Sequence, residues 1–388
     1  MNVLISLMYY RPHYSGMTVY AERLARALAV KGHQVTVLTS RFDPSLPGYE
    51  VRQGVTIIRP KVLMRISKGV IMPTLPYWAW KLVSKADVVN AHAPQPDAAL
   101  VASISKLLGK PVVLTYQCDL RLPEGLIHYI VNQGSHLANR LSGQLADTIV
   151  STSLDYAENS PFLSRYLDKV IAVQPPIQLA PVTPEDVAAF RSKYNLLPGQ
   201  RIIGMAARLA TEKGVEFLVE AMPKVLEKYP TARVLFAGQH QEVLGEEFYA
   251  QRLAPMINDL GDHWTFLGIL PATEWSVFFH EAEVTVLPSI NSTEAYGMVQ
   301  VESMTCGTPV VVSDLPGVRE PVRNTGMGLI VPPQNSDDLS KALVSILDKP
   351  NGYQGDIEKI KSHFAPETIA SEYERIFDRL IMNRGDEP

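Results

Sequence analysis

Residues 2–39 read NVLISLMYYRPHYSGMTVYAERLARALAVKGHQVTVLT, and this stretch determines the class of fold. Its two ends, 2–8 and 34–39, are apolar, β-rich runs of the kind expected for parallel strands that are buried on both faces. Between them, apolar side chains such as Tyr20 recur on one face of a helix, and Gly32 is placed to end that helix. A strand, a helix and a second strand predict a right-handed crossover, and therefore a doubly wound α/β sheet.

The same alternation continues along the chain and restarts once. Four prolines fall within residues 174–184, which we interpret as a linker between two domains. The final helix, 366–382, has no strand after it, and Ser336 is the expected cap of a late helix over 336–347. The domains expected are 1–180, 181–365 and a C-terminal helical segment, 366–388. The further strands expected are 55–59, 87–91, 111–116, 147–151, 169–173, 201–206, 232–237, 264–267, 284–287 and 309–313.

Composition excludes several classes of protein. The chain has 388 residues, of which 46% are hydrophobic, so it is long enough for two domains and is not intrinsically disordered. Two cysteines do not make a disulfide framework or a usual zinc site, which predicts a reducing, cytoplasmic location. We find neither a targeting segment nor an apolar run long enough to cross a bilayer. The net charge of −4 argues against nucleic-acid binding.

That net charge is unevenly distributed between the two halves. Residues 1–180 contain 18 Lys and Arg against 11 Asp and Glu, whereas residues 181–388 contain 18 against 29. Because ligands of doubly wound sheets bind at the carboxyl ends of the strands, the residues to inspect are those directly after each strand.

The most informative stretch after a strand is 291–314, NSTEAYGMVQVESMTCGTPVVVSD. In a continuous helix Glu294 and Glu302 would lie ~12 Å apart along the axis. Two carboxylates that flank one glycosidic bond lie only ~5–9 Å apart, so this spacing better suits an elongated ligand held at two points. Gly297 allows close backbone approach, and the helix that begins near Met298 offers amides to a phosphate. Taken alone, the two glutamates would more often be a helix cap and a solvated side chain.

A second stretch places two cations after a strand. In 204–214, GMAARLATEKG, Arg208 ends a strand and Lys213 opens the next helix. Two cations on one strand-end loop suit a diphosphate, whose charge must be neutralised as it departs. Two ordinary surface charges are the alternative when this loop is taken by itself.

These motifs together resemble the family 4 retaining glycosyltransferases. Residues 293–311 read T-E-A-Y-G-M-V-Q-V-E-S-M-T-C-G-T-P-V-V, close to the family pattern S-E-x-F-G-x-x-x-x-E-A-M-x-x-G-x-P-V-V. Residues 207–214 match G-R-L-x-x-x-K-G except that Ala207 replaces the first Gly. The resemblance implies a GT-B fold: two facing Rossmann-like doubly wound domains with an interdomain cleft, the acceptor on the N-terminal domain and the donor on the C-terminal one.

The resemblance also implies roles for individual residues. Glu294 and the backbone amides after it would hold the sugar, Glu302 the ribose hydroxyls, and Arg208 and Lys213 the diphosphate. Gly16, in the loop after the first strand where the family usually has Gly-Gly, would contact the donor. The remaining donor-contacting positions are Ala295, Tyr296, Gly297, Met298, Val299, Gly238, Ile269 and Leu270.

Three positions in the first half are expected to contact the acceptor or the sugar. Gln117 and Asp119 follow a strand, and many relatives have His where Gln117 stands. In those relatives the His contacts the transferred sugar. Gln can form hydrogen bonds but cannot be protonated, so this departure leaves open both the identity of the sugar and any catalytic role at this position. His92 also ends a strand, and it is equally a site residue or a satisfied buried histidine.

Residues 51–86 contain no Asp or Glu. They carry seven basic residues, interleaved with Tyr77, Trp78 and Trp80. This composition suits peripheral contact with an anionic membrane surface or a lipid acceptor. A solvated face around partly buried aromatics is the alternative. The basic residues are Arg52, Arg59, Lys61, Arg65, Lys68, Lys81 and Lys85.

By resemblance, the expected reaction is retaining transfer of a hexose from a nucleoside diphosphate sugar to a hydroxyl acceptor, a lipid or cell-envelope glycan precursor. A UDP-sugar is favoured as donor and GDP-mannose is possible; no metal or cofactor is expected, because there is no Asp-x-Asp signature.

The alternatives are a nucleotide-sugar epimerase of the same fold and a transferase for a small soluble acceptor. A dinucleotide dehydrogenase is weaker, because G-x-G-x-x-G does not follow the first strand. A non-enzymatic sugar-binding protein would usually be exported, which the lack of a signal segment disfavours.

Overall fold

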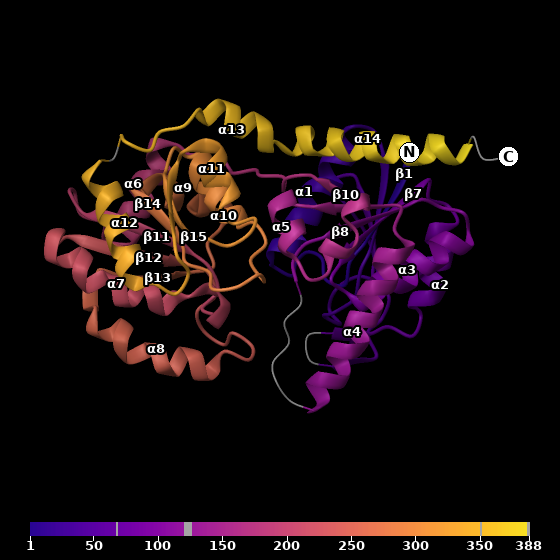
Figure 1. Ribbon diagram of the computed structural model, residues 1–388, viewed down its shortest axis with the longest axis horizontal. Helices are drawn as coiled ribbons and strands as arrows, with labels where there is room; N and C mark the ends of the chain where they lie inside the picture. The colour runs from indigo at the N-terminus through magenta and orange to yellow at the C-terminus, as the bar shows by residue number, and fades with distance from the viewer. Residues whose placement is uncertain (67–68, 120–125, 350, 386–388) are drawn as a thin grey trace. The chain divides into compact units, whose positions relative to one another are not determined.

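The computed structural model describes residues 1–66, 69–119, 126–349 and 351–385 (Figure 1). These residues form two compact units, each with its own sheet and core. Unit 1 contains Met1–Pro176 and the C-terminal segment that begins at Phe364, and unit 2 contains Ile177–His363.

Unit 1 is built on an eight-stranded sheet with the order β10-β9-β8-β7-β1-β2-β4-β3. All neighbouring strands are parallel except β3, which pairs antiparallel with β4 at the edge. β1 lies between β2 and β7, so the strand order reverses there. The strands are β1 (Asn2–Ser6), β2 (Gln34–Leu38), β3 (Tyr49–Arg52), β4 (Val55–Ile58), β7 (Val88–Ala93), β8 (Val112–Tyr116), β9 (Thr148–Ser151) and β10 (Val170–Ala172), with a separate hairpin of β5 (Met64–Ile66) and β6 (Gly69–Ile71).

Helices join the parallel strands of unit 1, as the first helix illustrates. Ser15 caps it with a reciprocal pair of hydrogen bonds to Thr18, and Gly32, at φ +91°, follows its end in a conformation that glycine adopts at little cost. Its apolar face, including Tyr20, is buried as the periodicity predicts. The helices are α1 (Gly16–Val30), α2 (Leu75–Val83), α3 (Pro96–Leu107), α4 (Leu126–Leu145), α5 (Leu154–Asn159) and α14 (Pro366–Gly385), with the 3₁₀ turns η1 (Leu163–Arg165) and η2 (Leu167–Lys169).

The last helix of the chain, α14, belongs to unit 1 and packs along α1 (Figure 1). The hydroxyl of Tyr373 lies 2.8 Å from that of Tyr20 on α1 and 2.9 Å from that of Thr115 on β8. Glu374 forms an ion pair with Lys31 and a hydrogen bond with His33 beside these buried contacts. Residues more than 200 positions apart in sequence therefore complete a single core.

Unit 2 contains six parallel strands in the order β13-β12-β11-β14-β15-β16. This order is that of a doubly wound dinucleotide-binding fold, and it reverses between β11 and β14. The strands are β11 (Arg201–Ala206), β12 (Ala232–Ala237), β13 (Trp264–Gly268), β14 (Val284–Leu287), β15 (Val310–Ser313) and β16 (Gly328–Val331).

Helices cover both faces of the second sheet. The core between the sheet and α7 and α12 contains Met205, Phe236 and Leu343, all fully buried. The N-cap of α12 is Asn335, whose side chain accepts a hydrogen bond from the Asp338 amide, and not Ser336 as predicted. The helices are α6 (Pro184–Lys193), α7 (Val215–Lys228), α8 (Glu247–Asp259), α9 (Ala272–Glu281), α10 (Met298–Thr305), α11 (Glu320–Thr325), α12 (Ser336–Asp348) and α13 (Ile357–Phe364), with the 3₁₀ turns η3 (Thr211–Lys213) and η4 (Gly261–His263).

Candidate active site

An ion pair lies at the point where the strand order of unit 2 reverses. Arg208 and Lys213 follow β11, and Glu294 follows the neighbouring strand β14. The ammonium Nζ of Lys213 lies 2.6 Å from Glu294 Oε2, and the side chains are only 21% and 15% exposed. Ser289 Oγ also donates to the same carboxylate, at 3.4 Å. Lys213 and Glu294, which were singled out in separate motifs, are therefore in direct contact.

Glycines allow these strand-end loops to approach each other. Gly214 has φ +62°, and a Cβ added there would lie 2.1 Å from the carbonyl oxygen of Pro288. Gly297 has φ +77°, and a Cβ there would lie 2.2 Å from Leu287 Cδ2. Both positions need a positive φ and the absence of a side chain, which only glycine provides at low cost. The backbone is thus shaped around Lys213 and Glu294.

Arg208 is held by a carboxylate of its own loop. Its Nη2 lies 2.9 Å from Glu212 Oε1, and the side chain is half-exposed. Each of the two cations therefore has one acidic partner within unit 2. A diphosphate that bound here would compete with Glu212 and Glu294 for the same donors, because guanidinium and ammonium groups bind both kinds of oxyanion.

Glu302 lies on α10 and is buried. The indole Nε1 of Trp275, on α9, donates to Glu302 Oε2 at 3.1 Å, so this carboxylate is oriented by a residue that the sequence motifs did not indicate. The only available signal was the need of a buried indole N–H for an acceptor. Burial, reinforced by the charge of Glu302, raises the pKa of the neighbouring Cys306 thiol to about 12.

The loop before α10 presents backbone to the same region. Gly297 is the N-cap of α10, so Met298 and Val299 supply the first helical amides, which have no partner within the helix. Ala295 and Tyr296 are buried side chains that anchor the loop. The expected amide donors therefore lie in the loop and first helical turn that directly follow Glu294 in the chain.

The turns after β12 and β13 lie side by side. The amide of Gly238 donates to the carbonyl of Gly268 at 2.8 Å. Ile269 is exposed, whereas the side chain of Leu270 is packed in the core. The ring of His240 stacks on Phe266 with centroids 4.3 Å apart, an aromatic pair at this turn that sequence reasoning missed.

In unit 1, Gly16 is the first residue of α1, His92 lies near the end of β7, and Gln117 directly follows the neighbouring strand β8. Gln117 Nε2 lies 3.4 Å from His92 Nδ1. The imidazole is fully buried, with its edge toward Tyr20, and burial lowers the pKa of His92 to about 3. His92 is therefore neutral at physiological pH.

Asp119 holds several loops of unit 1 together. Its carboxylate accepts hydrogen bonds from Ser160 at 2.6 Å and from Tyr116 at 3.1 Å. Its amide donates to the hydroxyl of Tyr156. The side chain is buried, and these contacts join the end of β8 to the segment around α5.

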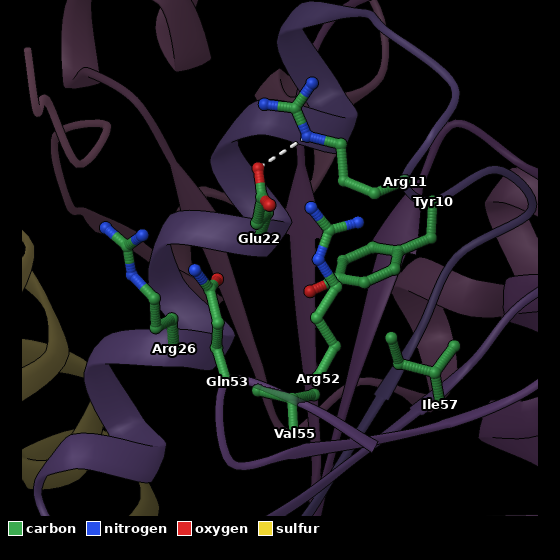
Figure 2. A pocket seen from close by; sticks show the side chains of 8 residues that line it. All are labelled: Tyr10, Arg11, Glu22, Arg26, Arg52, Gln53, Val55 and Ile57. Atoms are coloured by element: carbon green, nitrogen blue, oxygen red, sulfur yellow. Dashed lines mark hydrogen bonds and ion pairs between the residues drawn. The ribbon is translucent and has the colours of Figure 1, made fainter. Parts of the chain in front are cut away.

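A small cavity beside the β1–α1 loop contains several arginines (Figure 2). Its volume of about 10 Å³ has room for roughly one water molecule, which is too little for a sugar. Arg11 forms an ion pair with Glu22 of α1 there, and Arg26 and Arg52 also line the cavity. The ion pair ties the loop that precedes Gly16 to the body of α1.

The described residues contain no group of three His, Cys, Asp or Glu side chains arranged to hold a metal ion. Within the same residues, no helix combines the length and apolar character that crossing a bilayer requires.

Two doubly wound α/β units, the second with charged residues at its strand-order reversal, are the architecture of the GT-B fold. Residues 14–175 match the family model described as Glycosyltransferase Family 4, and residues 186–362 match that described as Glycosyl transferases group 1. The chain belongs to family 4 of the glycosyltransferases, and it is a glycosyltransferase with the GT-B fold.

Curated relatives and solved structures agree with this assignment. A phosphatidyl-myo-inositol mannosyltransferase of Mycobacterium leprae is 31% identical over 86% of this chain and 83% of its own length. A D-inositol 3-phosphate glycosyltransferase of Pseudarthrobacter chlorophenolicus is 24% identical over 86% of this chain and 82% of its own. The Anabaena protein HepE, in complex with UDP-glucose, is similar in fold, with a TM-score of 0.77 at 16% identity over 98% of this chain and 100% of its own.

Proposed function

We propose that this glycosyltransferase moves a hexose from a nucleoside diphosphate sugar to a hydroxyl acceptor with retention of anomeric configuration. The observation that carries the proposal is the contact between Lys213 and Glu294 where the strand order of unit 2 reverses, the usual ligand position in such sheets. Unit 2 then binds the donor and unit 1 the acceptor.

In this proposal the cations act on the leaving group. As the bond from the sugar C1 to the diphosphate oxygen breaks, negative charge grows on the diphosphate, and Arg208 and Lys213 stabilise it. Glu294 holds sugar hydroxyls and also orients Lys213, and Glu302, held by Trp275, binds the ribose hydroxyls. The acceptor hydroxyl oxygen attacks C1 on the face that the diphosphate leaves, and its proton passes to the departing diphosphate oxygen. No covalent glycosyl-enzyme forms, and no metal or cofactor is required.

The names of relatives guide the choice of substrates. The mannosyltransferases among them act on phosphatidylinositol derivatives, and one is named as GDP-mannose-dependent. Structural neighbours were solved with UDP or UDP-glucose. We therefore propose a lipid or cell-envelope precursor as acceptor, with UDP-sugars favoured and GDP-mannose as the second donor.

Proton NMR of each donor with a lipid extract and the enzyme tests this function. The expected result is release of the nucleoside diphosphate and a product whose anomeric configuration matches that of the donor, with the same activity in the presence of EDTA. Conversion of the donor sugar without an acceptor would instead identify the epimerase. A product of inverted configuration would contradict retention. Loss of activity in EDTA would contradict the prediction that no metal is required.

Peripheral membrane contact through residues 51–86 belongs to the same proposal and would place the enzyme on the inner face of a membrane. Arg59 takes no part, because its side chain is buried in an ion pair with Glu50. Lys68 lies outside the described residues. Lys81 is exposed and stacks on Tyr77. Sedimentation with anionic liposomes should fall steeply with salt. Equal sedimentation with neutral liposomes would contradict an electrostatic contact.

A further inference from the structure

A groove of about 440 Å³ opens in unit 1 at the carboxyl ends of β1 and β7. Met8 lies shortly after β1, and Pro96 and Asp97 begin α3 soon after β7. The order of the first sheet reverses between these two strands, so the groove occupies the ligand position of a doubly wound sheet. Its volume is in the range of small-molecule pockets, ~300–1,000 Å³.

The lining of the groove is apolar. Residues from the β5–β6 hairpin, the start of α2 and the first turns of α3 contribute to it, and among the described lining residues Asp97 is the only ionisable one. Burial raises the pKa of Asp97 to about 6, as expected for a carboxyl in apolar surroundings. The apolar side chains include Met8, Val70, Ile71, Met72, Leu75 and Leu100.

The surface around the groove is both apolar and basic. On the hairpin side Leu63 is 71% exposed, and on α2 Tyr77 is 60% exposed, so large apolar side chains face solvent on the segments beside the groove. The same segments carry exposed Lys61, Arg65 and Lys81. An apolar groove with cations outside it matches a molecule that has an apolar chain and an anionic head.

We propose that this groove holds one alkyl chain of an amphiphilic acceptor whose anionic head lies outside, at the basic residues of the hairpin and α2. The proposal rests on the proposed transfer to a lipid acceptor, and it identifies the part of the acceptor that unit 1 recognises. The orientation follows from charge: the carboxylate of Asp97 disfavours an anionic head inside the groove, whereas Arg65 and Lys81 attract it outside.

Calorimetric titration of the full chain at pH 7.5 with dodecyl phosphate, below its micelle concentration, and with butyl phosphate tests the proposal. The two probes share a head and differ in the chain. Because each buried methylene contributes to affinity, dodecyl phosphate should bind at least about 100-fold more tightly. Equal affinities would overturn the proposal, and this comparison needs no variant to remain folded.

Matched variants locate the binding. Ile71→Arg places a charge in the groove and should weaken dodecyl phosphate binding at least tenfold, whereas Val51→Arg, an exposed β-branched position on β3, should leave it unchanged. Wild-type affinity in Ile71→Arg would overturn the location. If the enzyme transfers a hexose but does not bind dodecyl phosphate, the assignment of the groove is wrong and the proposed function stands. If affinity rises with the length of the alkyl chain but no hexose is transferred, the proposed function is wrong and the assignment of the groove stands.

Discussion

At the scale of single residues, the indole of Trp275 allows a test of whether its hydrogen bond to Glu302 matters apart from its packing. Its N–H is bonded to Glu302, whereas the buried N–H of Trp264 has no hydrogen-bond partner among the described residues. Trp275→Phe should therefore weaken nucleotide binding tenfold or more, since losing a hydrogen bond to a charged group costs ~1.5–3 kcal/mol. Trp264→Phe, which removes the same atoms, should leave the affinity unchanged. Equal affinities by calorimetry in both variants would contradict a role for Trp275 in orienting Glu302.

A second residue-scale prediction concerns His92. Its pKa is about 3 when folded and near 6.5 when unfolded, so the unfolded chain binds an extra proton between these values. The contribution of His92 to stability is therefore present above pH ~6.5 and is lost toward pH 3, by at most ~1.4 kcal/mol per pH unit. Urea unfolding of wild type and His92→Gln between pH 4 and 7.5 measures it. The same pH slope in both proteins would contradict the prediction.

At the scale of elements, the loops after β11 and β14 depend on glycines without room for a side chain. Gly214→Ala should destabilise unit 2 by more than the ~1–2 kcal/mol of a left-handed residue alone, because its Cβ would meet Pro288. Gly326→Ala is the matched control, at φ +70° with no atom within 4 Å of the added Cβ. Chemical denaturation compares the two. An equal loss of unfolding free energy in the two variants would show that the loops after β11 and β14 can move apart to admit a side chain.

The strands illustrate how much of the fold the sequence predicts. Continuous apolar runs, such as those of β11, β12 and β14, give their bounds directly, because both faces are buried. β3 was not predicted, since it is an edge strand with mostly exposed side chains. The hairpin of β5 and β6 was missed as well, because strands of three residues have no measurable period.

The site divides in a similar way. Lys213 and Glu294 were found because each lies at a fixed offset within one short motif. Trp275 and Ser289 were not found, because their contacts with the two glutamates depend on how α9 and the β14 loop pack. The contact of Leu270 with the donor stays a prediction, and its side chain packs in the core of unit 2.

At the scale of the whole molecule, the two units differ in how many segments of the chain they contain: unit 1 has two and unit 2 has one. Unit 2 is one segment, Ile177–His363, with its own core, and should fold alone. Unit 1 needs α14, because Tyr373 fills its core and bonds to Tyr20 and Thr115. Residues 177–363 should therefore unfold cooperatively in urea, whereas residues 1–176 should do so only when 364–388 are fused back. Cooperative unfolding of 1–176 by itself would contradict this.

We propose that Lys213 holds the donor diphosphate where the sheet of unit 2 reverses its order. Calorimetric titration of UDP and GDP into wild type, Lys213→Ala and Lys228→Ala tests it directly. Lys228 is the matched control, because it also lies 2.6 Å from a carboxylate, Asp348, but at the end of α7. We predict that at least one nucleotide binds wild type and Lys228→Ala equally, and Lys213→Ala at least tenfold more weakly. Equal binding to all three proteins, or no binding of either nucleotide to wild type, would contradict the claim.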